Sequence, residues 1–233
     1  MPNDNSMDIY LERGKKKVFA CAVNWPGWCR SGPGDEPAIN SLLAYTQRYA
    51  AIIQPAGLVF PIPKGAADFD IIEWIEGNFA TDFGVPNLPI PEDYAPLSSE
   101  VVLKFMRILQ AEWLAFDQAV QEAQGKQLRK GPRGGGRELE EIVEHVTGAE
   151  KGYLRSLGWT AGVTGSESQK TSLELNRNNV IRGIQVAAQG SLPAVALQRG
   201  KRWPLAYFFR RIAWHVVDHT WEIEDRIIQV AQA

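Results

Sequence analysis

Cysteine is scarce in this chain of 233 residues. Only Cys21 and Cys29 are present, which is too few for a disulfide framework, and their spacing fits no metal-binding Cys-x-x-Cys motif. We therefore expect two reduced thiols, at least one of them buried. The sequence also lacks a long apolar run, and its polar N-terminus (MPNDNSMDIY) has no signal-peptide pattern. These absences predict a cytoplasmic protein with no membrane partner.

An excess of charge of either sign is missing too. The formal net charge is -2, which attracts neither nucleic acid nor an anionic membrane as a whole. Basic residues gather locally in KQLRKGPRGGGR (126–137) and in RGKR (199–202). We interpret both runs as solvated loops; the alternative is an anion site for a phosphate, carboxylate or thiol cosubstrate where the next helix begins. Because no aromatic residues are interleaved with this charge, the sequence disfavours nucleic-acid binding.

The first 76 residues have the pattern of a small α+β domain. MDIYLE and KKVFACAV are rich in β-branched and aromatic residues and predict two strands. GLVF (57–60) and FDIIEWI (69–75) predict two more. Between these pairs, apolar residues recur at helical spacing from Glu36 to Ile53, and Pro55 follows where a helix should stop.

The remainder of the chain has the pattern of a linker followed by helices. Residues 77–97 include several prolines and predict an irregular linker. Four amphipathic helices of about twenty residues each follow, with the apolar stripes of a common core. Their expected starts are near Ser98, Arg137, Ser168 and Pro204. The predicted fold class is therefore α+β with two domains, the second an all-α four-helix bundle over residues 98–233.

The chain has only three histidines, and we expect them to form one metal site. His215 and His219 are four residues apart on a helical segment, so their Cβ atoms lie about 6 Å apart on one apolar face. Both imidazoles can then reach one ion at a distance of about 2.1 Å. His145, on the apolar side of the second helix, is the candidate third ligand. Chance gives such an i, i+4 pair only about one time in forty, although single histidines on apolar faces are more often core residues.

Other residues near the histidines predict an open site. Gly148 and Gly152 share a helix face with His145, where they either open space beside a ligand or allow close helix packing. Three protein ligands with no obvious fourth are typical of a catalytic metal site. Glu222 is the favoured catalytic carboxylate. It lies three residues after His219 and could orient an imidazole or act on metal-bound water.

The histidine pattern resembles the DinB/YfiT-like superfamily. One histidine lies in the second helix (ELEEIVEHVTGAEKGYLRSLG) and H-x-x-x-H lies in the fourth (RRIAWHVVDHTWEIEDR). The match covers residues 98–233. The resemblance implies a four-helix bundle that holds nickel, zinc or another divalent ion through His145, His215 and His219. It also implies a low-molecular-weight thiol cosubstrate such as bacillithiol or mycothiol, because characterised relatives are thiol-dependent transferases and isomerases.

The N-terminal region resembles HicB-like domains. The stretch YLERGKKKVFACAVNWPGWCRSG, followed by the helix expected at 36–53, has their order of strand, Pro-Gly turn and helix. It departs from them in the tryptophans that flank the turn, and it has no DNA-binding appendage. The resemblance implies a small scaffold that covers the bundle or binds a partner. Trp25 and Trp28 are hard to bury within the turn, so we expect them to pack against the bundle or in a homodimer contact.

These patterns favour a metal-dependent enzyme of the DinB-like superfamily, a thiol-dependent transferase or hydrolase that acts on a small-molecule substrate. The alternative is a non-catalytic binding or regulatory module with a structural or empty histidine site. In that alternative, the N-terminal domain contacts a partner through an exposed Trp-Pro-Gly-Trp turn. A third reading, in which the basic loops bind nucleic acid, is the least favoured.

Overall fold

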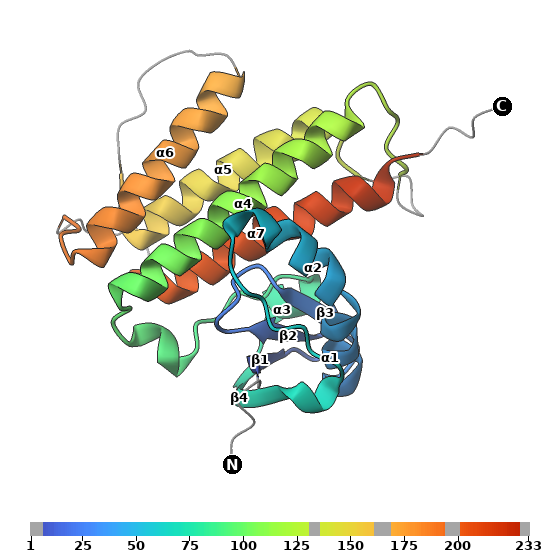
Figure 1. Cartoon of the computed structure of the whole chain (residues 1–233), viewed down its shortest axis with the longest axis vertical. Helices are drawn as coiled ribbons and strands as arrows, with labels where there is room; N and C mark the ends of the chain where they lie inside the picture. Colours follow the sequence, from blue (N-terminus) through green and yellow to red (C-terminus); the bar gives the residue numbers. More distant parts are fainter. Residues whose placement is uncertain (1–6, 131–135, 161–168, 194–200, 229–233) are drawn as a thin grey trace.

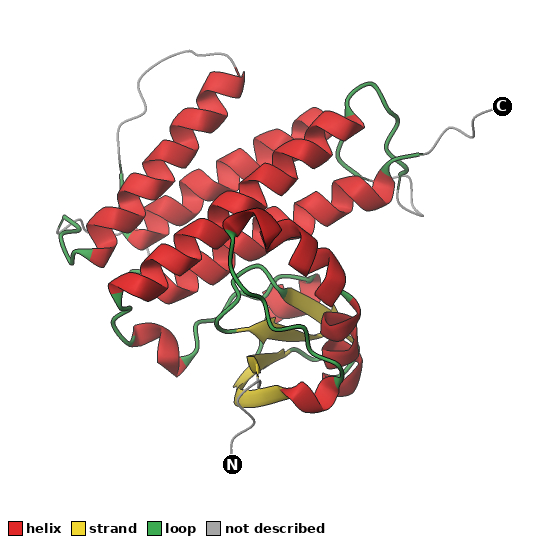
Figure 2. Cartoon of the chain, viewed as in Figure 1, coloured by secondary structure: helices red, strands yellow, loops and turns green. Residues whose placement is uncertain are grey.

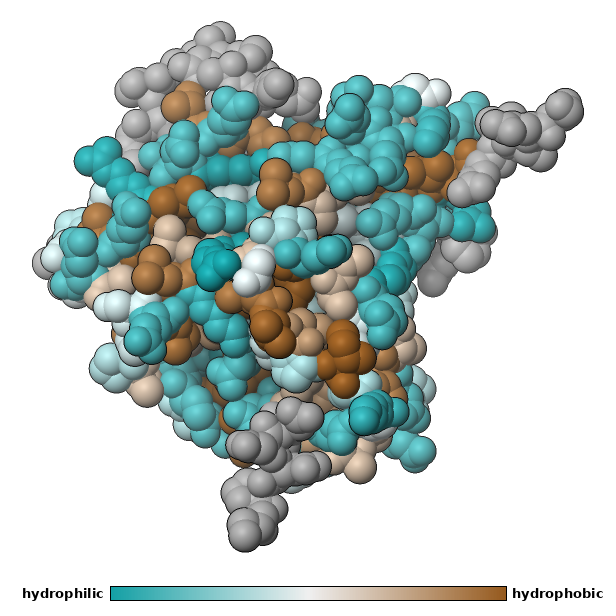
Figure 3. Space-filling view, viewed as in Figure 1, coloured by the Kyte–Doolittle hydropathy of each residue, from teal (hydrophilic) through white to brown (hydrophobic). Residues whose placement is uncertain are grey.

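The computed structural model describes residues 7–130, 136–160, 169–193 and 201–228. The fold is α+β: a small sheet in the N-terminal third is followed by long helices, which lie to one side of it (Figure 1). Helices make up most of the described chain, and the strands are confined to one end (Figure 2). On the face drawn in Figure 3, hydrophobic residues lie in small groups between hydrophilic ones. None of the helices within the described ranges has the length and apolarity needed to cross a membrane.

The sheet has four strands in the order β3-β2-β1-β4. Strand β1 is antiparallel to β2 and parallel to β4, and β3 is antiparallel to β2. The strands are β1 (Met7–Arg13), β2 (Val18–Ala22), β3 (Cys29–Gly32) and β4 (Phe69–Glu76). The strands expected at MDIYLE, KKVFACAV and FDIIEWI are confirmed. Strand β3 (CRSG) was not expected, because it has no β-branched residue and is a strand only through its pairing with β2.

The strand predicted at 57–60 is wrong. GLVF forms no strand, and Val59 is 93% exposed. Pro55 precedes the segment and Pro61 follows it, and neither residue can donate a backbone hydrogen bond to a neighbouring strand. The segment has high β-propensity, but it has no partner strand and therefore forms no strand itself.

The two cysteines correct another expectation. Cys21 and Cys29 are joined in a disulfide, so the prediction of reduced thiols is wrong. Cys21 of β2 lies directly opposite Cys29 of β3 in the antiparallel register. Side chains directly opposite one another on adjacent strands are close neighbours, whatever their spacing along the chain. The pairing of β2 with β3 brings the two cysteines together. The disulfide was not predicted because β3 was not predicted.

The helices that follow β3 are shorter than expected. The single helix predicted at 36–53 is divided at Tyr45, whose N–H donates to the carbonyls of Ser41 and Leu42 and ends the first segment. Residues 77–97 are less irregular than predicted, because Asn78 caps a short helix by accepting from the N–H of Ala80. The elements of this region are α1 (Asp35–Ala44), α2 (Thr46–Ile53), η1 (Gln54–Ala56), η2 (Ala66–Asp68), α3 (Phe79–Phe83) and η3 (Pro91–Tyr94).

Four long helices form the C-terminal part, and every pair of them is in contact. They are α4 (Ser99–Ala123), α5 (Leu139–Leu157), α6 (Gln169–Ala188) and α7 (Leu205–Arg226). The starts expected near Ser98, Arg137 and Pro204 are confirmed to within two residues, and Ser98 caps α4 through its hydroxyl. The start expected at Ser168 lies outside the described residues. The helices of this part therefore follow from their caps and apolar stripes.

One hydrophobic core extends from the sheet into the long helices. Trp28 is fully buried, stacks on Tyr49 and donates to the Leu42 carbonyl at 3.1 Å. Trp25 is also buried, and the Nζ of Lys104 in α4 lies 4.0 Å from its ring centroid. The Trp-Pro-Gly-Trp turn therefore packs against the helical part, which was one of the two expectations for its tryptophans, and the expectation that the turn is exposed is wrong. A homodimer stays a prediction. The division at 1–76, 77–97 and 98–233 stays a prediction.

Candidate metal centre

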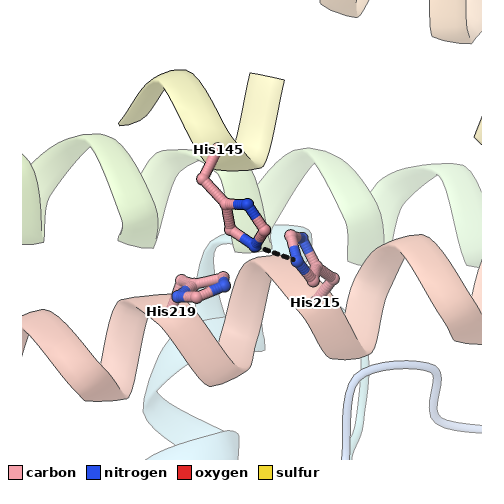
Figure 4. Close-up of side chains that lie close together, drawn as sticks. All are labelled: His145, His215 and His219. Carbon is pink, nitrogen blue, oxygen red and sulfur yellow. Dashed lines mark hydrogen bonds between the residues drawn. The ribbon is translucent and has the colours of Figure 1, made fainter. Parts of the chain in front are cut away.

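The three histidines converge from two helices. His145 comes from α5, and His215 and His219 come from α7, as Figure 4 shows. One ring nitrogen of each residue lies within 4.8 Å of those of the other two. The ring centroids are 5.0 Å apart for His145–His215, 5.0 Å for His145–His219 and 4.6 Å for His215–His219. Residues 70 positions apart in the sequence thus form one cluster.

The donor atoms of this cluster fit a divalent ion. The Nε2 atoms of His215 and His145 are 3.1 Å apart. Two ligand nitrogens in a tetrahedral site with bonds of about 2.1 Å lie about 3.4 Å apart, which is close to this spacing. Imidazole nitrogens are ligands that suit zinc and nickel. The residues present therefore fit a metal of this type.

Glu222 fixes the orientation of one imidazole. Its Oε2 lies 2.7 Å from Nδ1 of His219, and its Oε1 accepts a hydrogen bond of 2.6 Å from Arg226. With the proton on Nδ1 facing this carboxylate, the Nε2 lone pair of His219 remains available for an ion. Of the two roles expected for Glu222, the contact made here is the orienting one. Its role as a catalytic carboxylate stays a prediction.

Burial keeps two of the imidazoles neutral. Desolvation holds the pKa of His215 well below its ordinary value, and His219 and Arg211 lower it further. Desolvation also lowers the pKa of His145, with Arg137 as the next cause. The hydrogen bond from His219 lowers the pKa of Glu222, which is therefore ionised at neutral pH. Neutral imidazoles beside an anionic carboxylate have the charge state that metal ligation requires.

The space beside His145 is open. A Cβ atom added at Gly148 would meet no other atom within 4 Å, and one at Gly152 would meet only Nη2 of Arg155, at 3.9 Å. Neither glycine is therefore needed for close helix packing, which was one of the two expectations for them. His145 itself is only partly buried. The helix that carries His145 thus has free space at these two positions.

Three residues near the histidines were missed by the sequence analysis. The Tyr153 and Trp214 rings lie 5.7 Å and 6.0 Å from the His215 ring. The guanidinium of Arg211 lies over both rings, 5.0 Å from that of Tyr153 and 4.6 Å from that of Trp214. The sequence could have predicted that Arg211 lies near the site, because it is four residues before His215 and so shares its helix face.

Two buried carboxylates also escaped the sequence analysis. Glu150 accepts hydrogen bonds from Nε1 of Trp113 at 2.7 Å and Nδ2 of Asn176 at 2.6 Å, and burial raises its pKa to about 7. Glu112 is fully buried beside Gly27, has no hydrogen-bond partner among the described residues, and has its pKa raised well above the ordinary value by burial. Both carboxyls are held as core groups in which the neutral form is favoured.

The basic segments are described only in part. Residues 131–135 and 199–200 lie outside the described ranges, so the anion site expected where α5 begins stays a prediction. In the described part, Arg129 donates to the Asp225 carbonyl at 2.6 Å and Arg226 donates to the Arg137 carbonyl at 2.8 Å. These contacts tie the loop before α5 to the end of α7, close to Glu222.

The chain was compared with protein-family models, with curated proteins and with solved structures. None of the three comparisons found a match. The histidine cluster must therefore be interpreted from its own geometry, as three imidazoles of two helices that lie within ligand distance of one another.

Proposed function

We propose that this chain is a metal-dependent enzyme of the DinB-like type, in which His145, His215 and His219 hold a divalent ion such as zinc or nickel. One observation carries the proposal: three ring nitrogens from α5 and α7 lie within 4.8 Å of one another beside an open strip of helix surface. The four long helices, all in mutual contact, support the four-helix bundle that the family resemblance implies.

The surrounding residues have distinct tasks in this proposal. Glu222 holds His219 in the tautomer that points Nε2 into the cluster, and Arg226 holds Glu222 ionised. Tyr153 and Trp214 cover His215 and limit the entry of water from their side. The strip at Gly148 and Gly152 admits the substrate. A bound divalent ion would supply Lewis acidity and favour the thiolate form of a thiol cosubstrate.

The proposed reaction is thiol-dependent group transfer on a small molecule, with hydrolysis as the second choice. The alternative of a non-catalytic regulatory module is less favoured, because the Trp-Pro-Gly-Trp turn that was its contact surface is buried in the core. A screen of thiol-dependent transfer with bacillithiol, mycothiol and glutathione, each with zinc, nickel or cobalt loaded, tests the reaction class. Turnover that needs no thiol would favour hydrolysis.

Metal content tests the site itself. We expect about one ion per chain in the wild type and almost none in the double variant His215→Ala, His219→Ala, because one imidazole cannot hold the ion alone. The matched control is Gln118→Ala, Glu122→Ala, a pair at the same spacing on the exposed face of α4. Elemental analysis after dialysis gives the readout, and circular dichroism reports folding. Equal metal content in the histidine variant and the control would refute the proposal.

A further inference from the structure

Arg211 lies one helical turn before His215 on α7, and the two residues share their neighbours. The guanidinium of Arg211 lies over the rings of Tyr153 and Trp214, at 5.0 Å and 4.6 Å from their centroids. The same two rings lie beside the imidazole of His215. Residues four apart on a helix have Cβ atoms about 6 Å apart, so this cation is a close neighbour of the histidine cluster.

Arg211 forms no direct ion pair among the described residues, and the buried Glu12 acts on its charge only at longer range. Six other arginines form ion pairs with aspartate or glutamate: Arg13, Arg30, Arg48, Arg177, Arg210 and Arg226. Among the described residues, no carboxylate lies within ion-pair distance of Arg211. Its guanidinium lies over the ring of Tyr153, and its Nη1 atom is buried and has no hydrogen-bond partner among the described residues. A buried guanidinium N–H group without a partner is costly to keep unless an anion binds it.

The open strip of α5 connects this cation with the histidines. His145 contacts His215, and Tyr153 contacts Arg211, so α5 passes α7 in the antiparallel direction. Gly148 and Gly152 lie between His145 and Tyr153 in the sequence, and a Cβ at either position would have room. A small molecule lying along this strip could reach the histidine cluster at one end and Arg211 at the other.

We propose that Arg211, supported by Tyr153, binds the carboxylate of the substrate, so that the substrates of the histidine site are small carboxylic acids. This inference rests on the proposed function. A planar guanidinium that packs on two aromatic rings presents its donors in a fixed fork, which matches a carboxylate. Phosphate is less suited, because a dianion needs more donors than this one arginine offers.

Binding of benzoate and of its neutral analogue benzamide tests the inference, with tryptophan fluorescence as the readout because Trp214 lies against Arg211. Both ligands are titrated into metal-free and zinc-loaded protein. We expect Arg211→Gln to weaken benzoate binding by about tenfold or more, the effect of losing a charge-assisted hydrogen bond, and to leave benzamide binding unchanged. Arg211→Lys should retain part of the affinity, because it keeps the charge without the fork. The matched control, Arg182→Gln on the exposed side of α6, should bind benzoate like the wild type.

Several outcomes would overturn the inference. The first is equal affinity for benzoate in the wild type and Arg211→Gln. The second is a wild type that does not prefer benzoate to benzamide. The third is a wild type that binds inorganic phosphate more tightly than benzoate. Loss of zinc from Arg211→Gln would also overturn it, because the arginine would then support the histidines instead of a ligand. If the wild type itself takes up no metal, the proposed function fails, and the titration of metal-free protein still decides the role of Arg211.

Discussion

The Nδ1 atom of His219 lies 2.7 Å from Oε2 of Glu222, one turn later on the same helix, and Arg226 holds the other oxygen of that carboxylate. The hydrogen bonds among these three residues keep the proton of His219 on Nδ1, the nitrogen that faces away from the histidine cluster. Removing the charge of Glu222 should therefore weaken metal binding without removing a ligand.

We expect Glu222→Gln to lower zinc affinity by about 10-fold to 100-fold, the usual effect of losing a carboxylate that orients a ligating histidine. Competition with a chromogenic chelator measures the affinity. Glu224→Gln serves as the control, because Glu224 is on the same helix but pairs with Arg48 at the surface. Equal zinc affinities for the two variants would show that Glu222 does not orient a ligand.

Alanine substitutions at two helical glycines should have opposite effects. Gly148→Ala on α5 should raise the unfolding free energy by about 0.5–1 kcal/mol, because alanine is the better helix former and the new Cβ meets no other atom. Gly183→Ala on α6 should lower it, because its Cβ would lie 2.8 Å from Leu154 Cδ2 and 2.9 Å from Trp159 Cδ1. Urea denaturation measures both. Destabilisation by Gly148→Ala would mean that the strip beside His145 is closed.

Glu150 should make the protein less stable as the pH rises through the slightly acidic range. Its folded pKa is about 7, above the value of about 4.5 in the unfolded chain, so the folded state binds more protons between these limits. The unfolding free energy should therefore fall between about pH 4.5 and 7, by no more than about 3 kcal/mol from this group, and then level off.

The variant Glu150→Gln should remove that dependence and be more stable than the wild type at pH 8. Its amide oxygen can still accept from Trp113, and its amide nitrogen can donate to Oδ1 of Asn176 once the Asn176 amide flips to present that oxygen, which has no partner among the described residues. Urea denaturation from pH 5 to 8 gives the comparison, with the exposed Glu122→Gln as control. Parallel pH profiles for wild type and Glu150→Gln would contradict the prediction.

Loss of a buried ion pair should cost far more than loss of a surface pair. Arg210 and Asp93 form two hydrogen bonds and are almost completely buried, at 6% and 1% side-chain exposure. Arg210→Gln should destabilise the fold by about 3–5 kcal/mol, because Asp93 would be left buried without its partner. Arg48→Gln, which removes surface pairs with Glu224 and Asp225, should cost at most about 1 kcal/mol. Chemical denaturation compares them, and similar losses would mean that Asp93 gains solvent when Arg210 is removed.

Local patterns of the sequence predicted much of the fold correctly. Apolar stripes and caps placed the long helices, because a helix end is set by neighbours within one turn, as Ser98 shows for α4. A high content of β-branched and aromatic residues predicted β1, β2 and β4, whereas the strand expected at GLVF failed because pairing, which is not local, decides whether such a segment becomes a strand.

For the candidate site, the H-x-x-x-H spacing by itself determined that His215 and His219 share one face of a helix, because helix geometry is the same in every chain. The tertiary structure alone decided that His145 meets them, that Cys21 meets Cys29, and that Arg211 has no carboxylate partner among the described residues. It also buried Glu150, whose residue type is seldom fully buried. These relationships join residues that are remote in sequence, and only the packing of the whole chain brings such residues within contact distance.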